Sequence, residues 1–473
     1  MEKKTEKKTG LRVYCVLFFV LLWIPLLGMF FYRDREVNKK AAEASFPQAR
    51  MADGSWNVEF LPQLGDYFAD HFALRWEIIE ADSWIKGKVF GMSGDDGVIQ
   101  GRDGYYFYTE SLDDYLGKTS MDERELYGTA RVLALIQEYV EDQGGSFVFT
   151  VAPNKSTLYP QYMPYYHRKI QEEGNLERIV EQLERAGVAY VDLKNAFDQE
   201  EEVLYHRLDS HWNNKGAALA MSTILDALGR EHTEYGKIPY EIRRDFDGDL
   251  YDMVFPLGHG KDENVYYEKE DAFSYGEGFK DTEDVQIQTT NPDREGGVVM
   301  FRDSFGNSLT PFVAEEYGRG YFDRTVPYPV DALTKEDADA LIFEIVERHL
   351  DILAKEAPRM PAPVRDYQEW GQEEIAGVTM EVEDADPYTK VTGAIPGEDL
   401  DVDSEIYIRC VSTEETVVYE AAPLNEDPQE PGMYGYGLYV PGEGLEPGTY
   451  IMETLYKKEG AWVTSGYLQS ITI

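Results

Sequence analysis

Residues 298–307 read VVMFRDSFGN, and this stretch determines the fold class that we expect. The apolar run ends at Asp303 and Ser304, and residues 308–317, SLTPFVAEEY, have the pattern of a helix. A serine at a turn from strand to helix exposes its hydroxyl group, and its backbone N–H points into the same pocket. We therefore predict a buried strand, a turn that presents Ser304, and a helix after it.

A second segment, LDSHWN at residues 208–213, places Asp209 two residues before His211. If this segment is a turn, the Asp209 carboxylate can accept the Nδ1–H of His211 and leave Nε2 free to act as a base. With Ser304 as the nucleophile, the three residues would form a catalytic triad. Each part alone is common, and Asp303-Ser304 could equally cap the following helix. Their joint occurrence favours the triad.

Apolar segments alternate with helical patterns from residue 122 to residue 346. We predict buried strands at residues 147–152, 188–193, 296–301 and 340–346, and helices at residues 122–142, 175–186 and 214–228. This alternation predicts an α/β fold with a parallel sheet and helices on both faces. Ligands of such sheets bind beyond the carboxyl ends of the strands. Asn154 and Ser304 each follow a predicted strand, so we expect both at one edge of the sheet.

The sequence changes character near residue 357. Residues 357–372 begin with APRMPAPV, which is typical of a Pro-rich linker. Residues 373–473 contain short segments of alternating apolar and polar residues, separated by turns that carry Gly and Pro. This pattern predicts a β-sandwich. We expect it to be a domain separate from the α/β domain of residues 55–356.

The N-terminal region contains 20 uncharged residues at positions 13–32. This length is sufficient for a helix that spans a bilayer, so we predict an uncleaved transmembrane signal anchor. Residues 1–12 would then be a cytoplasmic tail, because five basic residues precede the run and four follow it. Residues 33–54 would connect the membrane helix to the domains outside.

The formal net charge is −44, from 89 acidic and 45 basic residues. Such a surface repels phosphate backbones, so we exclude nucleic acid as a partner. Cys15 lies in the predicted anchor and Cys410 is remote from it, so no disulfide within a domain is expected. These features predict a single-pass membrane protein whose catalytic domain lies outside a bacterial cell, of the Gram-positive type.

The segment LDSHWN, followed by Lys-Gly-Ala, resembles the family named for its Asp-His-His-Trp (DHHW) motif. That family is similar to the SGNH-hydrolase-like domains of the alginate O-acetyltransferases. The resemblance covers residues 55–355 and includes RDSF at 302–305, PNKSTLYP at 153–160 and GRDGYYF at 101–107. It implies the permuted order in which Asp and His precede Ser. The sequence departs from the pattern at Ser210, where the motif has His, and at Arg302, where relatives usually have Gly.

The resemblance and the residues together suggest further site residues. The oxyanion hole would use the backbone N–H of Ser304 and the side-chain amide of Asn154 or Asn307. Trp212 would either stack on a sugar ring or belong to the core. Tyr159, with Tyr162 and Tyr165, would line an acceptor groove or form a partly buried aromatic face. No His or Cys cluster has metal-ligand spacing, so we expect neither a metal nor a cofactor.

The resemblance implies an O-acetyltransferase that modifies hydroxyls of a cell-surface polysaccharide or exopolysaccharide through an acyl-serine. It also implies a multi-spanning membrane acyltransferase as the partner that supplies acetyl groups. Water in place of the sugar would make the protein a carbohydrate acetyl esterase. A third alternative is an inactive scaffold of the cell envelope that binds glycan.

Overall fold

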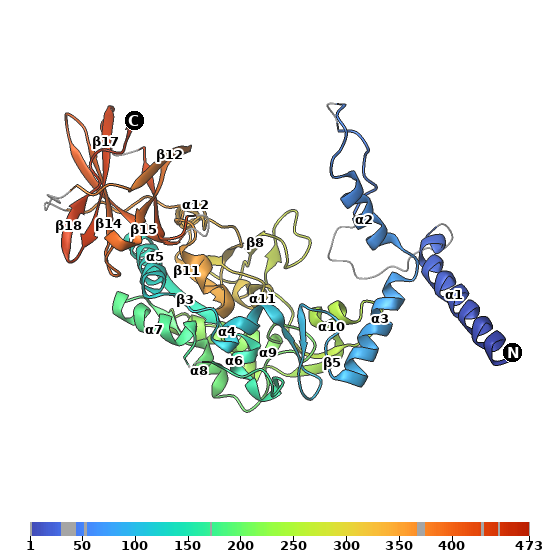
Figure 1. Ribbon diagram of the computed structural model, residues 1–473. Coiled ribbons are helices and arrows are strands. Elements are labelled where there is room, and N and C mark those ends of the chain that lie inside the picture. Colours follow the sequence, from blue (N-terminus) through green and yellow to red (C-terminus); the bar gives the residue numbers. More distant parts are fainter. Residues whose placement is uncertain are drawn as a thin grey trace. The chain divides into compact units, whose positions relative to one another are not determined.

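The computed structural model describes residues 2–29, 44–51, 54–170, 173–366, 374–426, 430–442 and 445–472 (Figure 1). The chain forms two compact units. One comprises Met1–Thr109, Arg207–Ser210 and Asp245–Asp262. The other comprises Glu110–His206, His211–Arg244 and Glu263–Ile473.

The larger unit contains a seven-stranded sheet in the order β4-β3-β11-β9-β10-β8-β7. Strands β4, β3, β11, β9 and β10 are parallel, whereas β8 and β7 add an antiparallel edge. The bounds are β3 (Ser146–Ala152), β4 (Tyr190–Val191), β7 (Ser274–Tyr275), β8 (Gln286–Thr290), β9 (Gly297–Phe301), β10 (Arg319–Asp323) and β11 (Ala340–Val346). The predicted parallel sheet is confirmed.

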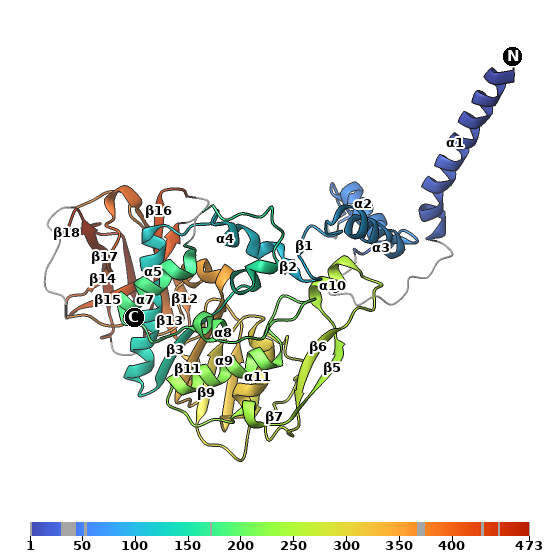
Figure 2. The same cartoon turned by 90° about the horizontal axis from the view of Figure 1, so that it is seen from below.

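Helices cover both faces of this sheet, as the sequence predicted. One face packs against α5 (Glu123–Asp142), α7 (Asn175–Ala186) and α12 (Ala332–Lys335). The other packs against α8 (Leu193–Asp198), α9 (Asn214–Ala227) and α11 (Gly306–Ala314), and α9 and α11 lie side by side (Figure 2). Strand β3 shows why both faces are apolar, because Phe149 enters the first core and Val148 the second. Two short helices, α4 (Leu112–Leu116) and α6 (Lys155–Leu158), complete the helices of this region.

The strands β3, β11 and β9 end at the same edge of the sheet. Val346 is in register with Ala152, and Phe343 is in register with Phe301. Strand β11 therefore extends three residues beyond the last paired residue of β9. The turn after β9 consequently lies beside the final residues of β11.

The smaller unit is mainly helical. It contains α1 (Glu2–Gly28), α2 (Phe60–His71), α3 (Arg75–Ile85), a π-helical turn (Lys86–Phe90) and α10 (Asp249–Val254). Residues 101–104, GRDG, lie in a hairpin between β1 (Val98–Gln100) and β2 (Tyr106–Tyr108). Outside these elements, β5 (Tyr240–Phe246) and β6 (Asp262–Tyr267) form a two-stranded sheet.

The predicted transmembrane anchor is not supported. In the part of the chain that the structure describes, no helix combines the length and apolarity that crossing a bilayer requires. Within the predicted span, α1 covers residues 13–28. Residues 30–32 of the span and 33–43 of the connector lie outside the described residues.

The C-terminal region is rich in β-strands, as predicted. Its antiparallel strands follow the order β12-β13-β16-β15-β14-β17-β18, and β19 also pairs with β17. The bounds are β12 (Thr379–Ala385), β13 (Tyr388–Pro396), β14 (Ile406–Val411), β15 (Thr416–Glu426), β16 (Met433–Pro441), β17 (Thr449–Lys458), β18 (Ala461–Thr464) and β19 (Gln469–Thr472). Strand β15 pairs with β14 through its first half and with β16 through its second, so it joins two halves of the sheet around one core.

The segment predicted as a Pro-rich linker packs against the fold in its described part, and its Val364 is exposed. Ala357 and Met360 share a hydrophobic core with residues of α5. The backbone N–H of Ala362 donates to the carbonyl of Tyr439, and that of Glu420 donates to the carbonyl of Pro363. Backbone groups of this segment therefore bond to β15 and β16 rather than to solvent. The domain boundaries stay a prediction, but the two regions share a packed interface.

A buried carboxylate strengthens this interface. Glu420 of β15 accepts hydrogen bonds from Nε of Arg131, on α5, at 2.6 Å and from Nε of Arg365 at 2.7 Å. Arg365 also pairs with Glu138 of α5. The Glu420 side chain is 1% exposed, so its removal would leave two arginines without their buried partner.

We expect Glu420→Gln to lower the free energy of unfolding by about 2 kcal/mol, because breaking a buried pair leaves uncompensated charge and the partly exposed arginines recover some hydration. Urea denaturation measures this change. Glu414→Gln, at an exposed carboxylate of the same region, should leave the midpoint unchanged.

A shared core also predicts one cooperative transition. Two separate transitions would instead favour independent domains divided near residues 357–372.

Candidate active site

The structure brings Ser304 and His211 together. Nε2 of His211 lies 2.9 Å from Oγ of Ser304. Ser304 occupies the turn between β9 and α11, and His211 lies in the loop before α9. An imidazole nitrogen at this distance from a hydroxyl can remove its proton. The ring of Phe305 meets the imidazole edge-on, with centroids 4.8 Å apart.

The carboxylate of Asp303 fixes the turn that carries Ser304. Its Oδ1 accepts the backbone N–H of Phe305 at 2.8 Å, and its Oδ2 accepts the backbone N–H of Val346 at 2.7 Å. One side chain thus closes the turn and attaches it to the end of β11. Among the described residues, the backbone N–H of Ser304 has no acceptor. It is therefore available to a ligand, as an oxyanion hole requires.

Trp212 fixes the position of His211 rather than presenting a face to solvent. Its indole is 1% exposed and packs against Phe197 and Phe305. Its Nε1 donates to Oγ of Ser308 at 2.8 Å, one helical turn after Ser304. Burial leaves no free ring face for a sugar, so the packing role explains this tryptophan. Trp212 thus joins the loop of His211 to α11, the helix that follows Ser304.

Asn213 completes the local structure of this loop. Its Oδ1 accepts the backbone N–H groups of Lys215 and Gly216, both at 3.0 Å, and so caps α9. The backbone N–H of Asn213 also donates to the carbonyl of Leu204. A capped helix start on one side and a backbone bond on the other restrict where His211 can lie.

Asp209 is buried in the smaller unit, two residues before His211. Its Oδ2 accepts the backbone N–H of Asp249 at 2.9 Å. Asp249 in turn accepts the hydroxyl of Ser210 at 2.7 Å, which gives the departure from the family motif at that position a structural role. The orienting role of Asp209 stays a prediction. Asp249 was not among the predicted site residues; its sequence signal is the DGD turn at residues 247–249.

Two residues that were expected to contact substrate are buried and hydrogen-bonded within the protein. Asn154 is 1% exposed; its Nδ2 donates to Asp114 at 2.9 Å, and its backbone N–H donates to Glu347 at 2.7 Å. Tyr159 is also buried, and its hydroxyl accepts the backbone N–H of Leu204 at 3.0 Å. Both residues therefore stabilise the segment after β3.

Asn307 is placed differently. It is only half-buried, and its backbone N–H donates to the carbonyl of Ser304 at 3.1 Å. Its Oδ1 accepts Nη1 of Arg302 at 2.6 Å. Of the two amides considered for the oxyanion hole, that of Asn154 is buried and bonded to Asp114, whereas Asn307 is half-buried.

Buried acids lie along the edge of the sheet near this turn. Burial, and then the charge of Asp303, raise the pKa of Glu344 well above its usual range. Burial, and then the charge of Asp114, raise the pKa of Glu347 to about 8. Burial also raises the pKa of Asp114 to about 6. A single Glu inside the apolar segment ALIFEIV was the sequence signal for Glu344.

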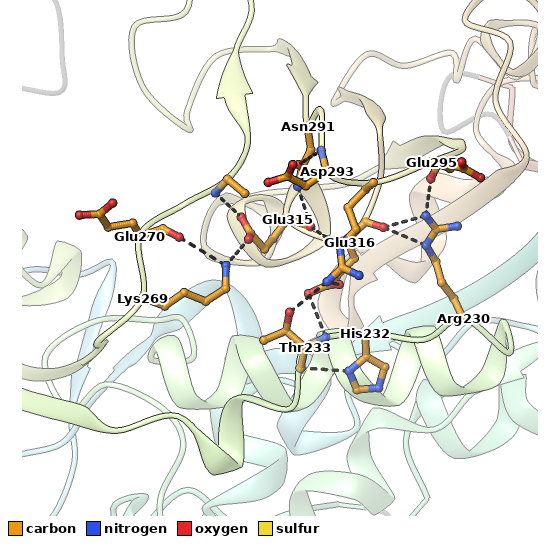
Figure 3. Close-up of polar contacts among 12 residues, drawn as sticks. Arg230, His232, Thr233, Lys269, Glu270, Asn291, Asp293, Glu295, Glu315 and Glu316 are labelled. Atoms are coloured by element: carbon orange, nitrogen blue, oxygen red, sulfur yellow. Dashed lines mark hydrogen bonds and ion pairs between the residues drawn. The ribbon is translucent and has the colours of Figure 1, made fainter.

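The far end of α11 is held by ion pairs. Glu315 and Glu316 follow the helix and are buried (Figure 3). Lys269 pairs with Glu315, and Arg294 lies 2.7 Å from Glu316. The backbone N–H of Thr233 donates to Glu316 at 3.0 Å. The helix that begins beside Ser304 is thus anchored at both ends.

Comparisons with known proteins agree with the predicted resemblance. Residues 98–255 match the sequence model of the family described as SGNH hydrolase-like domain, acetyltransferase AlgX. The predicted family resemblance is confirmed. The probable alginate O-acetylase AlgJ of Pseudomonas putida is 22% identical over 140 residues, which cover 29% of this chain and 35% of AlgJ. The match thus spans about a third of that relative.

Two solved structures are also similar. A DHHW family protein from Eubacterium siraeum has a TM-score of 0.41 and 17% identity, over 54% of this chain and 91% of that protein. Bacillus cereus PatB1 has a TM-score of 0.43 and 14% identity, over 54% of this chain and 98% of PatB1.

The raised pKa of Glu347 predicts a stability that depends on pH. The unfolded chain releases this proton near pH 4.5, whereas the folded protein retains it to about pH 8. Stability should therefore fall as pH rises through this window. Glu347→Gln keeps an acceptor for Asn154 but does not titrate. From about pH 5 to about pH 8, its free energy of unfolding should gain about 3–4 kcal/mol relative to the parent protein.

Urea denaturation at both pH values measures this difference. Glu184→Gln, at an exposed carboxyl on α7, serves as the control and should follow the parent at both values. Parallel pH profiles for the parent and Glu347→Gln would show that Glu347 is ionised in the folded protein.

Proposed function

We propose that this chain is a carbohydrate O-acetyltransferase that acetylates hydroxyls of a cell-surface polysaccharide or exopolysaccharide. The distance of 2.9 Å between His211 Nε2 and Ser304 Oγ carries the proposal. The family match at residues 98–255 supports acetyl transfer as the reaction.

In the first half-reaction, Oγ of Ser304 attacks the carbonyl carbon of an acetyl donor. His211 Nε2 takes the hydroxyl proton, and Asp209 stabilises the imidazolium. The free N–H of Ser304 donates to the developing oxyanion. The tetrahedral intermediate then collapses. The leaving group departs with the proton from His211, and the acetyl group remains on Ser304.

In the second half-reaction, a sugar hydroxyl replaces the leaving group. Neutral His211 removes its proton, and the sugar oxygen attacks the acetyl-serine. Ser304 leaves and recovers the proton from the imidazolium, so the site returns to its starting state. Water at the same position would give hydrolysis instead, so an acetyl esterase uses the same residues. An inactive scaffold would not need this arrangement.

The donor completes the proposal. Polysaccharides at the cell surface lie outside the cell, whereas acetyl groups are activated in the cytoplasm. A multi-spanning membrane acyltransferase would then deliver acetyl groups to Ser304. The family resemblance, not the geometry of the site, is what supports this partner.

The role of Ser304 can be tested with a chromogenic acetyl ester. Ser304→Ala should lower turnover by about 10⁴-fold, because the acyl-serine no longer forms. The free energy of unfolding should change by less than about 1 kcal/mol, since a half-buried hydroxyl contributes little to stability. Intact-mass measurement should show an acetyl adduct only in the parent protein.

Ser222→Ala removes a hydroxyl that donates only to the backbone of its own helix, α9, and should retain full activity. Unchanged turnover in Ser304→Ala would refute the nucleophile. Oligosaccharides added to the acetylated parent protein then separate the two reactions. Acetylated sugar identifies a transferase, and free acetate alone identifies an esterase.

A further inference from the structure

Arg302 forms a buried connection next to the turn of Ser304. Its side chain is 3% exposed. Nη1 donates to Oδ1 of Asn307 at 2.6 Å and to the carbonyl of Asp303 at 3.2 Å. Nη2 donates to the carbonyls of Thr282 and Asp284 at 3.1 and 2.8 Å. Four acceptors therefore fix the plane of the guanidinium.

This connection determines the orientation of the Asn307 amide. A guanidinium can only donate, so the atom of Asn307 that faces Arg302 must be the oxygen. The amide nitrogen consequently points to the other side of the side chain. In the described part of the chain, Nδ2 of Asn307 has no acceptor. Its two N–H groups remain available to a ligand.

Asn307 and Ser304 belong to one turn. The backbone N–H of Asn307 donates to the carbonyl of Ser304 at 3.1 Å. Side chains three residues apart in such a turn lie on the same face, about 5–6 Å apart at Cβ. An acetyl group on Ser304 would therefore lie beside the amide of Asn307. Asn154 offers no such donor, because it is buried and its amide binds Asp114.

From these contacts we infer that Nδ2 of Asn307 is the second donor to the oxyanion, beside the N–H of Ser304, and that Arg302 is the residue that positions it. The inference rests on the proposed acyl-serine chemistry. It assigns Arg302 no contact with substrate.

Gly306 supports the same arrangement. A Cβ atom at Gly306 would lie 2.6 Å from both Cβ and Cδ of Arg302. Only glycine leaves room for the arginine stem to fold over the start of α11. A glycine at position 302, which relatives usually have, would leave Oδ1 of Asn307 without this donor. With Arg302 in place of glycine, and with Gly306 leaving room for its side chain, position 302 is fixed rather than flexible and holds Asn307.

Asn307→Asp tests the donor directly. The aspartate keeps an oxygen for Arg302 but replaces the N–H groups with an acceptor. Turnover of the acetyl ester should fall by about 10²- to 10³-fold in kcat, with KM within about threefold, because the interaction forms only with the oxyanion. Asn195→Asp, at an exposed amide on α8, is the matched control and should leave kcat unchanged. A kcat of Asn307→Asp equal to that of the parent would overturn the inference.

Arg302 is tested through its coupling to Asn307. Arg302→Met alone should lower kcat with little change in KM, and Arg302→Lys should recover part of the loss. In the Asn307→Asp background, Arg302→Met should add no further loss, because its effect passes through the amide. Losses that multiply would show that Arg302 acts independently of Asn307 and would refute the positioning role.

Thermal unfolding of each variant identifies losses caused by misfolding. If Arg302→Met does not fold, Arg302→Lys and its double variant with Asn307→Asp give the same comparison.

Ser304→Ala distinguishes failure of this inference from failure of the proposed function. An inert Ser304→Ala together with fully active Asn307→Asp would refute this inference alone, whereas an active Ser304→Ala would refute the proposed function.

Discussion

The site depends on one carboxylate that joins two strands of the sheet. Asp303 bonds the backbone N–H of Phe305 within its own turn and that of Val346 at the end of β11. Parallel strands are otherwise connected only by their ladder, which ends where each strand ends. Because β11 extends beyond β9, the carboxylate can continue the attachment past the last ladder bond. Without it, the turn of Ser304 would lose its bond to the end of β11.

The same edge of the sheet concentrates ionisable groups that a protein interior normally excludes. Glu344, Glu347 and Arg302 are all buried there. Each is retained for a different reason. Glu347 accepts the N–H of Asn154, Arg302 holds Asn307, and Glu344 accepts the N–H of Asp303 at 3.3 Å. Burial disfavours the charged form of each group, which lowers the pKa of Arg302 to about 10 and raises that of both acids. The fold thus gives up stability to fix the backbone around Ser304.

The sequence predicted what depends on local pattern. Continuous apolar segments identified β3, β9 and β11, and the helical pattern of residues 122–142 identified α5. The meeting of Ser304 and His211 followed from the strand edge and the motif. Other properties depend on packing at long range. The burial of Trp212 is set by Phe197, Phe305 and Ser308, which are distant in sequence. No local pattern contains that information.

The expected linker shows the same limit. Proline between two patterned regions is typical of an exposed connector, yet residues 357–366 pack along β15 and β16. Proline lacks an N–H but keeps its carbonyl, so Pro363 can accept from Glu420 at the edge of the sheet. The apolar pattern of α5 would have revealed this packing, because its apolar surface is wider than contact with the parallel sheet alone requires. Ten of its residues are buried, and part of that surface faces the C-terminal strands.

Acceptor choice has a separate physical origin from catalysis. In the proposed mechanism both half-reactions use Ser304 and His211, so substituting either residue would lower transfer and hydrolysis together. A change in their ratio must come from a side chain that touches the acceptor alone. Trp212 and Tyr159 are buried and cannot take this role, whereas Tyr165 is 74% exposed. Aromatic faces bind sugars only where the ring is accessible. Under the proposed mechanism, selection between sugar and water would therefore depend on exposed residues and could change while the turn of Ser304 stays fixed.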